Sequence, residues 1–182
     1  MKELSLNILD IAENSVKAGA SLTEITIIEN TDMLTLTIKD DGCGMTEEIL
    51  RSVTDPFYTT RTTRKVGLGI PLLKLAAEQT GGHIVINSKT EKESPDSHGT
   101  EVIAKFNKNH LDFTPLGDVI STMTALVQGH PDTDFLFTHK GTDFSVCVDT
   151  REMREVLGDV PLNSFEVICW LGDYLREQYQ CV

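Results

Sequence analysis

The sequence predicts an α+β protein in which one mixed or antiparallel sheet is covered by helices on at least one face, as in a two-layer α/β sandwich. Two observations carry this prediction. Apolar side chains recur at helical spacing in some segments and alternate with polar residues, as in half-buried strands, in others. Turn-forming residues such as Asn30–Asp32 and Gly81–Gly82 separate these segments.

The chain begins with an expected helix over residues 4–18, whose apolar residues fall on one side at about 100° per residue. Gly19 is a suitable residue to end it. Two alternating runs follow, over 24–29 and 33–39, and residues 30–32 form the turn between them. The sequence therefore predicts a helix followed by a hairpin.

The middle of the chain alternates between helices and strands. A short helix is expected over 46–53, because Thr46 is a good N-cap and two acidic residues follow it. Residues 54–66 are rich in Thr and Arg and are expected to form a mobile loop. A further helix over 70–79 is followed by strands over 83–88 and 100–106.

The C-terminal part has its own pattern of elements. A helix is expected over 116–127, and two strands over 135–139 and 144–148 form a second hairpin. Helices over 151–157 and 164–179 complete the chain. The topology suggests that the second hairpin completes the sheet of the N-terminal part. The last helix either packs on its own core or presents an interaction or dimer surface.

Charge is distributed unevenly along the 182 residues. Residues 1–109 hold 16 acidic and 12 basic residues, whereas residues 110–182 hold 12 acidic and 4 basic residues. All the motif-like glycine clusters lie in the first part. We therefore expect a domain over 1–109 and a small acidic α+β extension over 110–182.

Composition excludes several classes of protein. The net charge of −12 disfavours a nucleic-acid binder, because phosphate contacts need clustered basic side chains. No apolar run approaches the roughly 18–20 residues of a membrane span, and the N-terminus lacks a signal peptide's apolar core. The four cysteines form no CxxC pair. We expect a cytoplasmic protein with reduced thiols.

One face of the first helix carries Asp10, Asn14 and Lys17, which lie within about 40° of one line, opposite the apolar face. An acid, an amide and an amine on one stripe suit water, a hard cation and a phosphate. The amide oxygen of Asn14 is a ligand that Mg²⁺ accepts beside waters and phosphate oxygens. An ordinary solvated helix face has the same pattern, so both interpretations stay open.

Three further segments carry glycines where close approach to a ligand is useful. The run Asp40–Gly44 follows a strand, and its first carboxylate could accept a hydrogen bond from an amino group; a plain turn is the alternative. Residues 55–69 gather Arg61, Arg64 and Lys65 before Gly67, Leu68 and Gly69, which lead into a helix. Such a helix start favours anions, although a surface loop is also consistent. His98–Thr100 adds a glycine and a hydroxyl before a strand.

The order of these motifs resembles the ATP-binding domain shared by DNA gyrase, heat-shock chaperones, histidine kinases and MutL-type mismatch-repair proteins, the GHKL superfamily. The resemblance covers residues 4–106 and implies a Bergerat-type ATP-binding fold with ATP and Mg²⁺ as cofactors. Asp10–Ser21 resembles the N box, which implies Asn14 as the Mg²⁺ ligand and Lys17 as a phosphate contact.

The other motifs imply the rest of the site. Asp40–Gly44 resembles the first glycine box, so Asp40 is implied to bind adenine, beside Gly42 and Gly44. Residues 55–58 resemble the F box, and residues 59–61 resemble a lid segment of some histidine kinases, so Arg61 is implied to reach the γ-phosphate. The second glycine box would comprise Gly67, Leu68 and Gly69, and Thr100 would belong to the terminal GT pair.

The departures from the family pattern concern the reaction. Gyrase- and MutL-type ATPases have a Glu four residues before the Asn, where this chain has Asp10, about one methylene shorter, so we expect hydrolysis to be slow or absent. Nine residues precede Asp10, so we expect no helical hairpin with a phospho-accepting histidine.

Three functions are compatible with this pattern. The first is an ATP-dependent kinase that phosphorylates or regulates a partner protein in trans, with Asp10 as the catalytic base. The second is an ATPase or ATP-switched module. The third is a non-catalytic nucleotide sensor whose acidic tail docks a partner. The chain also resembles stand-alone proteins found beside iron-only hydrogenase components, which implies a link to an iron-only hydrogenase system. A homodimer is compatible with each.

Overall fold

The computed structural model describes residues 3–55 and 68–180, and within them the order of elements matches the sequence prediction. The N-terminal part contains α1 (Leu4–Lys17), β1 (Leu22–Glu29), β2 (Met33–Asp40), α2 (Glu47–Ser52), α3 (Gly69–Gln79), β3 (His83–Lys89) and β4 (Gly99–Asn107). The C-terminal part contains α4 (Val119–Gly129), β5 (Asp134–Lys140), β6 (Ser145–Asp149), α5 (Thr150–Leu157) and α6 (Phe165–Gln180).

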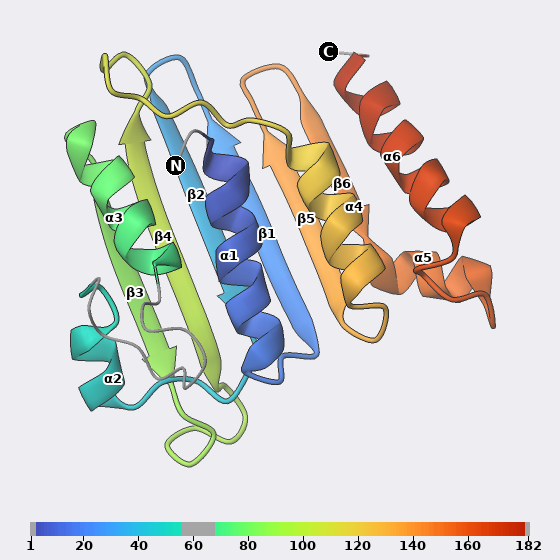
Figure 1. The fold of residues 1–182 in the computed structure, drawn as a ribbon, viewed down its shortest axis with the longest axis horizontal. Coiled ribbons are helices and arrows are strands. Elements are labelled where there is room, and N and C mark those ends of the chain that lie inside the picture. Colours follow the sequence, from blue (N-terminus) through green and yellow to red (C-terminus); the bar gives the residue numbers. More distant parts are fainter. Residues whose placement is uncertain (1–2, 56–67, 181–182) are drawn as a thin grey trace.

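The described strands form one sheet in the order β3-β4-β2-β1-β5-β6. Neighbouring strands are antiparallel except β1 and β5, which run parallel with Ile25 opposite Phe137. Helices α1, α3 and α4 lie across one face of this sheet, and α6 lies beyond α4 at the β6 side (Figure 1). The α+β class and the mixed sheet in two layers are therefore confirmed, as is the prediction that the second hairpin completes the sheet.

The core lies between the sheet and the helices and crosses the boundary between the two parts. Ile8 of α1 and Phe106 of β4 belong to the same buried cluster as Phe137 of β5 and Leu171 of α6. Burying large apolar side chains of this kind contributes about 1.5–3 kcal/mol each. The N-terminal part and the acidic extension thus share one hydrophobic core.

The segment that enters α4 also ties the two parts together. The backbone N–H of Leu4 donates to the carbonyl of Pro115 at 2.9 Å. The helix itself begins at Val119, three residues later than expected, because Gly117 has a φ of 78° and Asp118 caps the helix by accepting from the N–H of Ser121. Turn geometry therefore overrides the apolar periodicity at this end.

A buried polar network joins α6 to the sheet. His139 of β5 is 2% exposed, and its Nε2 lies 3.1 Å from the Glu29 carboxylate while its Nδ1 lies 2.8 Å from the Tyr179 hydroxyl. Lys108 donates to the other oxygen of Glu29 at 2.6 Å. Burial lowers the pKa of His139, against the opposing effect of Glu29. Burial also raises the pKa of Tyr179.

Candidate nucleotide site

Asp40 is the best-oriented acidic group in the region that the motifs indicated. It ends β2, is 8% exposed, and accepts hydrogen bonds from three donors. The backbone N–H groups of Gly42 and Thr100 donate to Oδ1 at 3.0 and 3.2 Å, and the Ser15 hydroxyl donates to Oδ2 at 2.7 Å. A carboxylate has about four acceptor positions, so the described residues leave one position on Oδ2 for a ligand donor.

The glycine turn, residues 41–44, follows β2 and is held in place by contacts on two sides. Gly44 has a φ of 69°, and a Cβ there would overlap the carbonyl of Lys89, so the turn needs glycine at this position. Nδ1 of His98 lies 2.6 Å from the carbonyl of Gly42, which fixes the turn against the loop before β4. The turn therefore has a defined shape without any bound molecule.

The second acid of the turn, Asp41, faces away from Asp40 and toward the start of β1. Its carboxylate accepts from the N–H groups of Ser21 and Leu22 at 2.7 and 2.9 Å. Burial pushes its pKa up, but these hydrogen bonds outweigh that effect and the pKa of Asp41 is lowered. Asp41 therefore stabilises the turn, whereas the neighbouring Asp40 faces the candidate site.

Helix α1 forms the next wall and meets the start of α3. A Cβ built on Gly69 would lie 3.2 Å from the Cβ of Asp10 and 3.9 Å from Nδ2 of Asn14. The structure therefore brings these two predicted residues together with the second glycine box. Lys17 lies on the same helix, but its amine contacts Glu13 at 2.9 Å, and Glu13 in turn contacts His130 at 2.6 Å.

The start of α3 supplies the polar end of the site. Leu68 occupies the N-cap position, and its side chain accepts no hydrogen bond from the first N–H groups of the helix. The positive end of the helix dipole favours an anion here, beside Asp10 and Asn14. Gly67 of the second glycine box lies outside the described residues, as do Arg61 and the rest of the expected lid over 56–66.

Thr100 contributes through its backbone more than through its hydroxyl. Its N–H holds Asp40, whereas its Oγ1 lies 2.9 Å from the hydroxyl of Ser88. Ser88 also accepts from the N–H of Met45 at 2.8 Å. Ser88 thereby connects β3 to Met45, which directly follows the glycine turn.

Sequence reasoning missed Ser15 and the positioning role of His98. Ser15 is 3% exposed and lies on the apolar side of α1, with its hydroxyl also 3.4 Å from the Ile11 carbonyl. A hydroxyl on the core stripe of a helix is the signal that could have found it, because a buried donor needs a partner. Pairing it with Asp40 required the tertiary structure.

Helix α1 links the two ends of this candidate site, because Ser15 donates to Asp40 while Asp10 and Asn14 lie beside Gly69. A carboxylate acceptor and a helix start without a side-chain cap suit a ligand with an amino group and an anionic group, as in a nucleotide. Comparison with known families agrees. Residues 2–110 match the family described as histidine kinase-, DNA gyrase B- and HSP90-like ATPase. The chain belongs to this family of ATPase domains, which confirms the resemblance found in the sequence.

Two curated relatives are a kinase and a sensor protein. It is 32% identical over 92 residues to sporulation kinase E of Bacillus subtilis, which covers 50% of this chain and 12% of that protein. It is 34% identical over 113 residues to the sensor protein SrrB of Staphylococcus aureus, which covers 59% of this chain and 18% of that protein. The chain thus spans less than a fifth of either curated relative.

Solved structures agree on the fold. The ATPase domain of Aquifex aeolicus MutL, complexed with ADP, matches with a TM-score of 0.57 and 15% identity, covering 86% of this chain and 69% of that one. The N-terminal domain of a DNA repair protein matches with a TM-score of 0.55 and 12% identity, covering 82% and 52%. The shared fold extends past residue 110 into the acidic extension. Among the described helices, none is long and apolar enough to cross a membrane.

Proposed function

We propose that this protein binds ATP between the glycine turn, α1 and the start of α3. The observation that carries the proposal is Asp40, a carboxylate held by three donors with one acceptor position left on Oδ2. The exocyclic amine of adenine is a donor that fits this position. Family membership and the ADP complex of the related MutL domain support the same ligand.

The phosphates would lie toward α3. The helix start and Gly69 supply N–H groups without a side chain in the way, and the side-chain amide of Asn14 lies beside them. We propose that Asn14 is the protein ligand of Mg²⁺, which typically keeps waters and phosphate oxygens as its other ligands. When bound, the ion neutralises phosphate charge. Lys17 and Arg61 remain predicted phosphate contacts.

For the reaction, we propose phosphoryl transfer to a partner protein in trans. Asp10 is exposed and lies beside Gly69 at the phosphate end, where a base would accept the proton of an incoming hydroxyl group. Positioning and charge neutralisation contribute most of the catalysis in such transfers. The similarity to a sporulation kinase and a sensor protein supports a signalling role, which we place in the cytoplasm.

The short side chain of Asp10 favours a second candidate. Because it is about one methylene shorter than the Glu of gyrase- and MutL-type ATPases, water activation is weaker. The protein would then act as a slowly hydrolysing, ATP-switched regulatory module. The resemblance to proteins found beside iron-only hydrogenase components suggests such an enzyme system as its partner.

Two measurements separate these functions. ATP labelled at the γ-phosphate is incubated with the protein and candidate partners, and the kinase proposal expects label on a protein; no labelled protein with any partner would contradict it. Release of inorganic phosphate by the protein alone measures hydrolysis. Asp10→Asn should abolish either reaction, while Glu47→Gln, exposed on α2, serves as the matched control. Unchanged rates in Asp10→Asn would exclude Asp10 as the base.

A further inference from the structure

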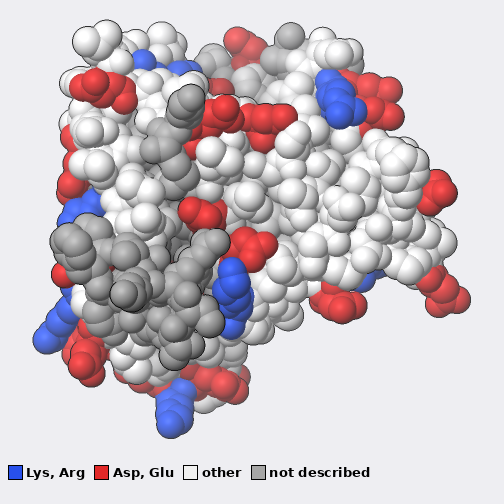
Figure 2. All heavy atoms as spheres, in the orientation of Figure 1, with Lys and Arg blue, Asp and Glu red and all other residues white. Residues whose placement is uncertain are grey.

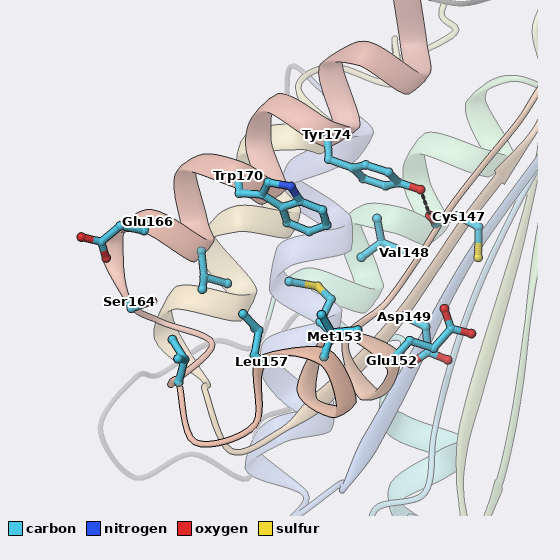
Figure 3. A pocket seen from close by; sticks show the side chains of 13 residues that line it. Cys147, Val148, Asp149, Glu152, Met153, Leu157, Ser164, Glu166, Trp170 and Tyr174 are labelled. Carbon is cyan, nitrogen blue, oxygen red and sulfur yellow. Dashed lines mark hydrogen bonds between the residues drawn. The ribbon is translucent and has the colours of Figure 1, made fainter.

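An apolar groove lies at the edge of the sheet opposite β3, between α5, α6 and the end of β6. Its volume is about 840 Å³. Figure 3 shows Trp170 and Tyr174 reaching into it from α6, with Met153 and Leu157 on α5 facing them.

Large apolar side chains are left in contact with solvent along this groove. Trp170 is 53% exposed, Val156 is 88% exposed and Val160 is 48% exposed. The rings of Trp170 and Tyr174 stack with centroids 5.2 Å apart, and the Tyr174 hydroxyl lies 3.5 Å from the carbonyl of Cys147. An aromatic pair beside exposed apolar residues is typical of an interaction site.

The charge around the groove is acidic at both ends. Glu166 lies at one end and Glu152 at the other (Figure 3), whereas Asp149 beside Glu152 is paired with Arg151, and no Lys or Arg is among the described lining residues. Residues 145–180 hold seven acids and three bases. Each of those three arginines is paired with an aspartate within the described structure. In Figure 2, acidic side chains likewise gather at the margin of the largely uncharged surface over α5 and α6.

The apolar middle and acidic ends of the groove favour a basic partner over a second copy of this chain. A second copy that docked through the same groove by a twofold axis would bring carboxylates against carboxylates, in a chain whose net charge is already −12. A helix with an apolar stripe and Lys or Arg at both ends would instead fill the apolar middle and meet the acidic ends. Helix-in-groove binding uses such anchors at i, i+3, i+4 and i+7.

We propose that the groove between α5 and α6 docks a basic amphipathic helix of a partner protein. The groove lies at the β6 edge, whereas the nucleotide site lies against α1 and α3 over the other strands (Figure 1). A docked helix therefore leaves the nucleotide site open. The proposal does not depend on which reaction the nucleotide site performs.

A designed peptide tests this proposal directly on the full chain. The probe has about 14 residues, four helical turns, with Leu at i, i+3, i+4 and i+7 and Lys at both ends. A matched peptide carries Glu in place of Lys. Trp170 is the only tryptophan of the chain, so its fluorescence reports binding in the groove, and calorimetry gives the affinity.

The expected result is a shift of Trp170 emission with the Lys peptide and binding at least about tenfold weaker with the Glu peptide. Val156→Asp, and separately the pair Glu152→Lys with Glu166→Lys, should each weaken binding of the Lys peptide by about tenfold. These positions are exposed, so the variants should keep the fold. Leu111→Asp, at a site 97% exposed before α4, should bind normally.

Three outcomes would overturn the proposal. Equal binding of both peptides would refute the role of charge, and absence of any emission change up to about 1 mM peptide would refute docking of a basic helix. Self-association of the protein alone that Val156→Asp abolishes would show that a second copy occupies the groove. Sedimentation velocity at increasing protein concentration detects that case.

Discussion

Replacing Asp40 with asparagine tests the nucleotide site with little change of shape. Both backbone N–H groups that hold Asp40, from Gly42 and Thr100, donate to Oδ1, so this atom must remain an oxygen in the variant. The new NH₂ group therefore takes the place of Oδ2. It can donate to the Ser15 hydroxyl, whose own proton can turn to the Ile11 carbonyl. The fold should lose only about 1 kcal/mol.

The effect on the ligand is larger because the free acceptor position lies on Oδ2. In Asp40→Asn, a donor NH₂ faces the amino group of adenine, and a charge-assisted hydrogen bond worth about 1.5–3 kcal/mol is lost. This corresponds to roughly 10- to 150-fold weaker ATP binding. Inosine triphosphate carries a carbonyl in place of the amine and can accept from the new NH₂.

Calorimetry with both nucleotides measures the outcome. The wild-type protein should prefer ATP, and Asp40→Asn should shift the ratio of affinities toward inosine triphosphate by at least about tenfold. A thermal melt lowered by only about 2–4 °C shows that the variant is folded. Undiminished ATP binding by the folded variant would refute the placement of the base at Asp40.

Three further predictions concern stability, each read from urea unfolding. Asn7 is 1% exposed, and both polar atoms of its side chain lack a partner among the described residues, so Asn7→Leu should raise the free energy of unfolding by about 1–2 kcal/mol; a loss would show that this amide is satisfied. Burial lowers the pKa of His139 below its usual 6.5, so the unfolded chain binds the proton more readily. The contribution of neutral His139 to the free energy of unfolding is fully present above pH 6.5. It decreases as the pH falls below 6.5, by at most about 1.4 kcal/mol per pH unit. His139→Gln should remove that slope; an unchanged slope would assign it to another group. Gly99 has a φ of 122°, and a Cβ there would overlap a backbone carbonyl, so Gly99→Ala should cost on the order of 2–4 kcal/mol. Gly129→Ala, in open space at the end of α4, is the control and should be neutral or stabilising.

Much of the fold could be predicted because local patterns were consistent with it. Alternation over residues 33–39 placed Leu34, Leu36 and Ile38 on the buried face of β2, where the structure has them. The late start of α4 could not be read from apolar spacing, because a positive φ at Gly117 decides it. The groove between α5 and α6 could not be predicted from the sequence either. A helix has the same apolar pattern whether its apolar face is buried in the core or exposed as a binding surface.

The sequence by itself determined the class of protein and predicted a candidate site, because glycine turns, a helix stripe and a strand-end carboxylate need particular residues at fixed spacing. It could not decide which groups orient that carboxylate. Ser15 and Thr100 stand 25 and 60 residues from Asp40 along the chain, and only folding brings their donors to its two oxygens. Tertiary packing likewise decided that the acidic extension continues the sheet, because β5 pairs with β1, from which it is separated by more than a hundred residues in the sequence.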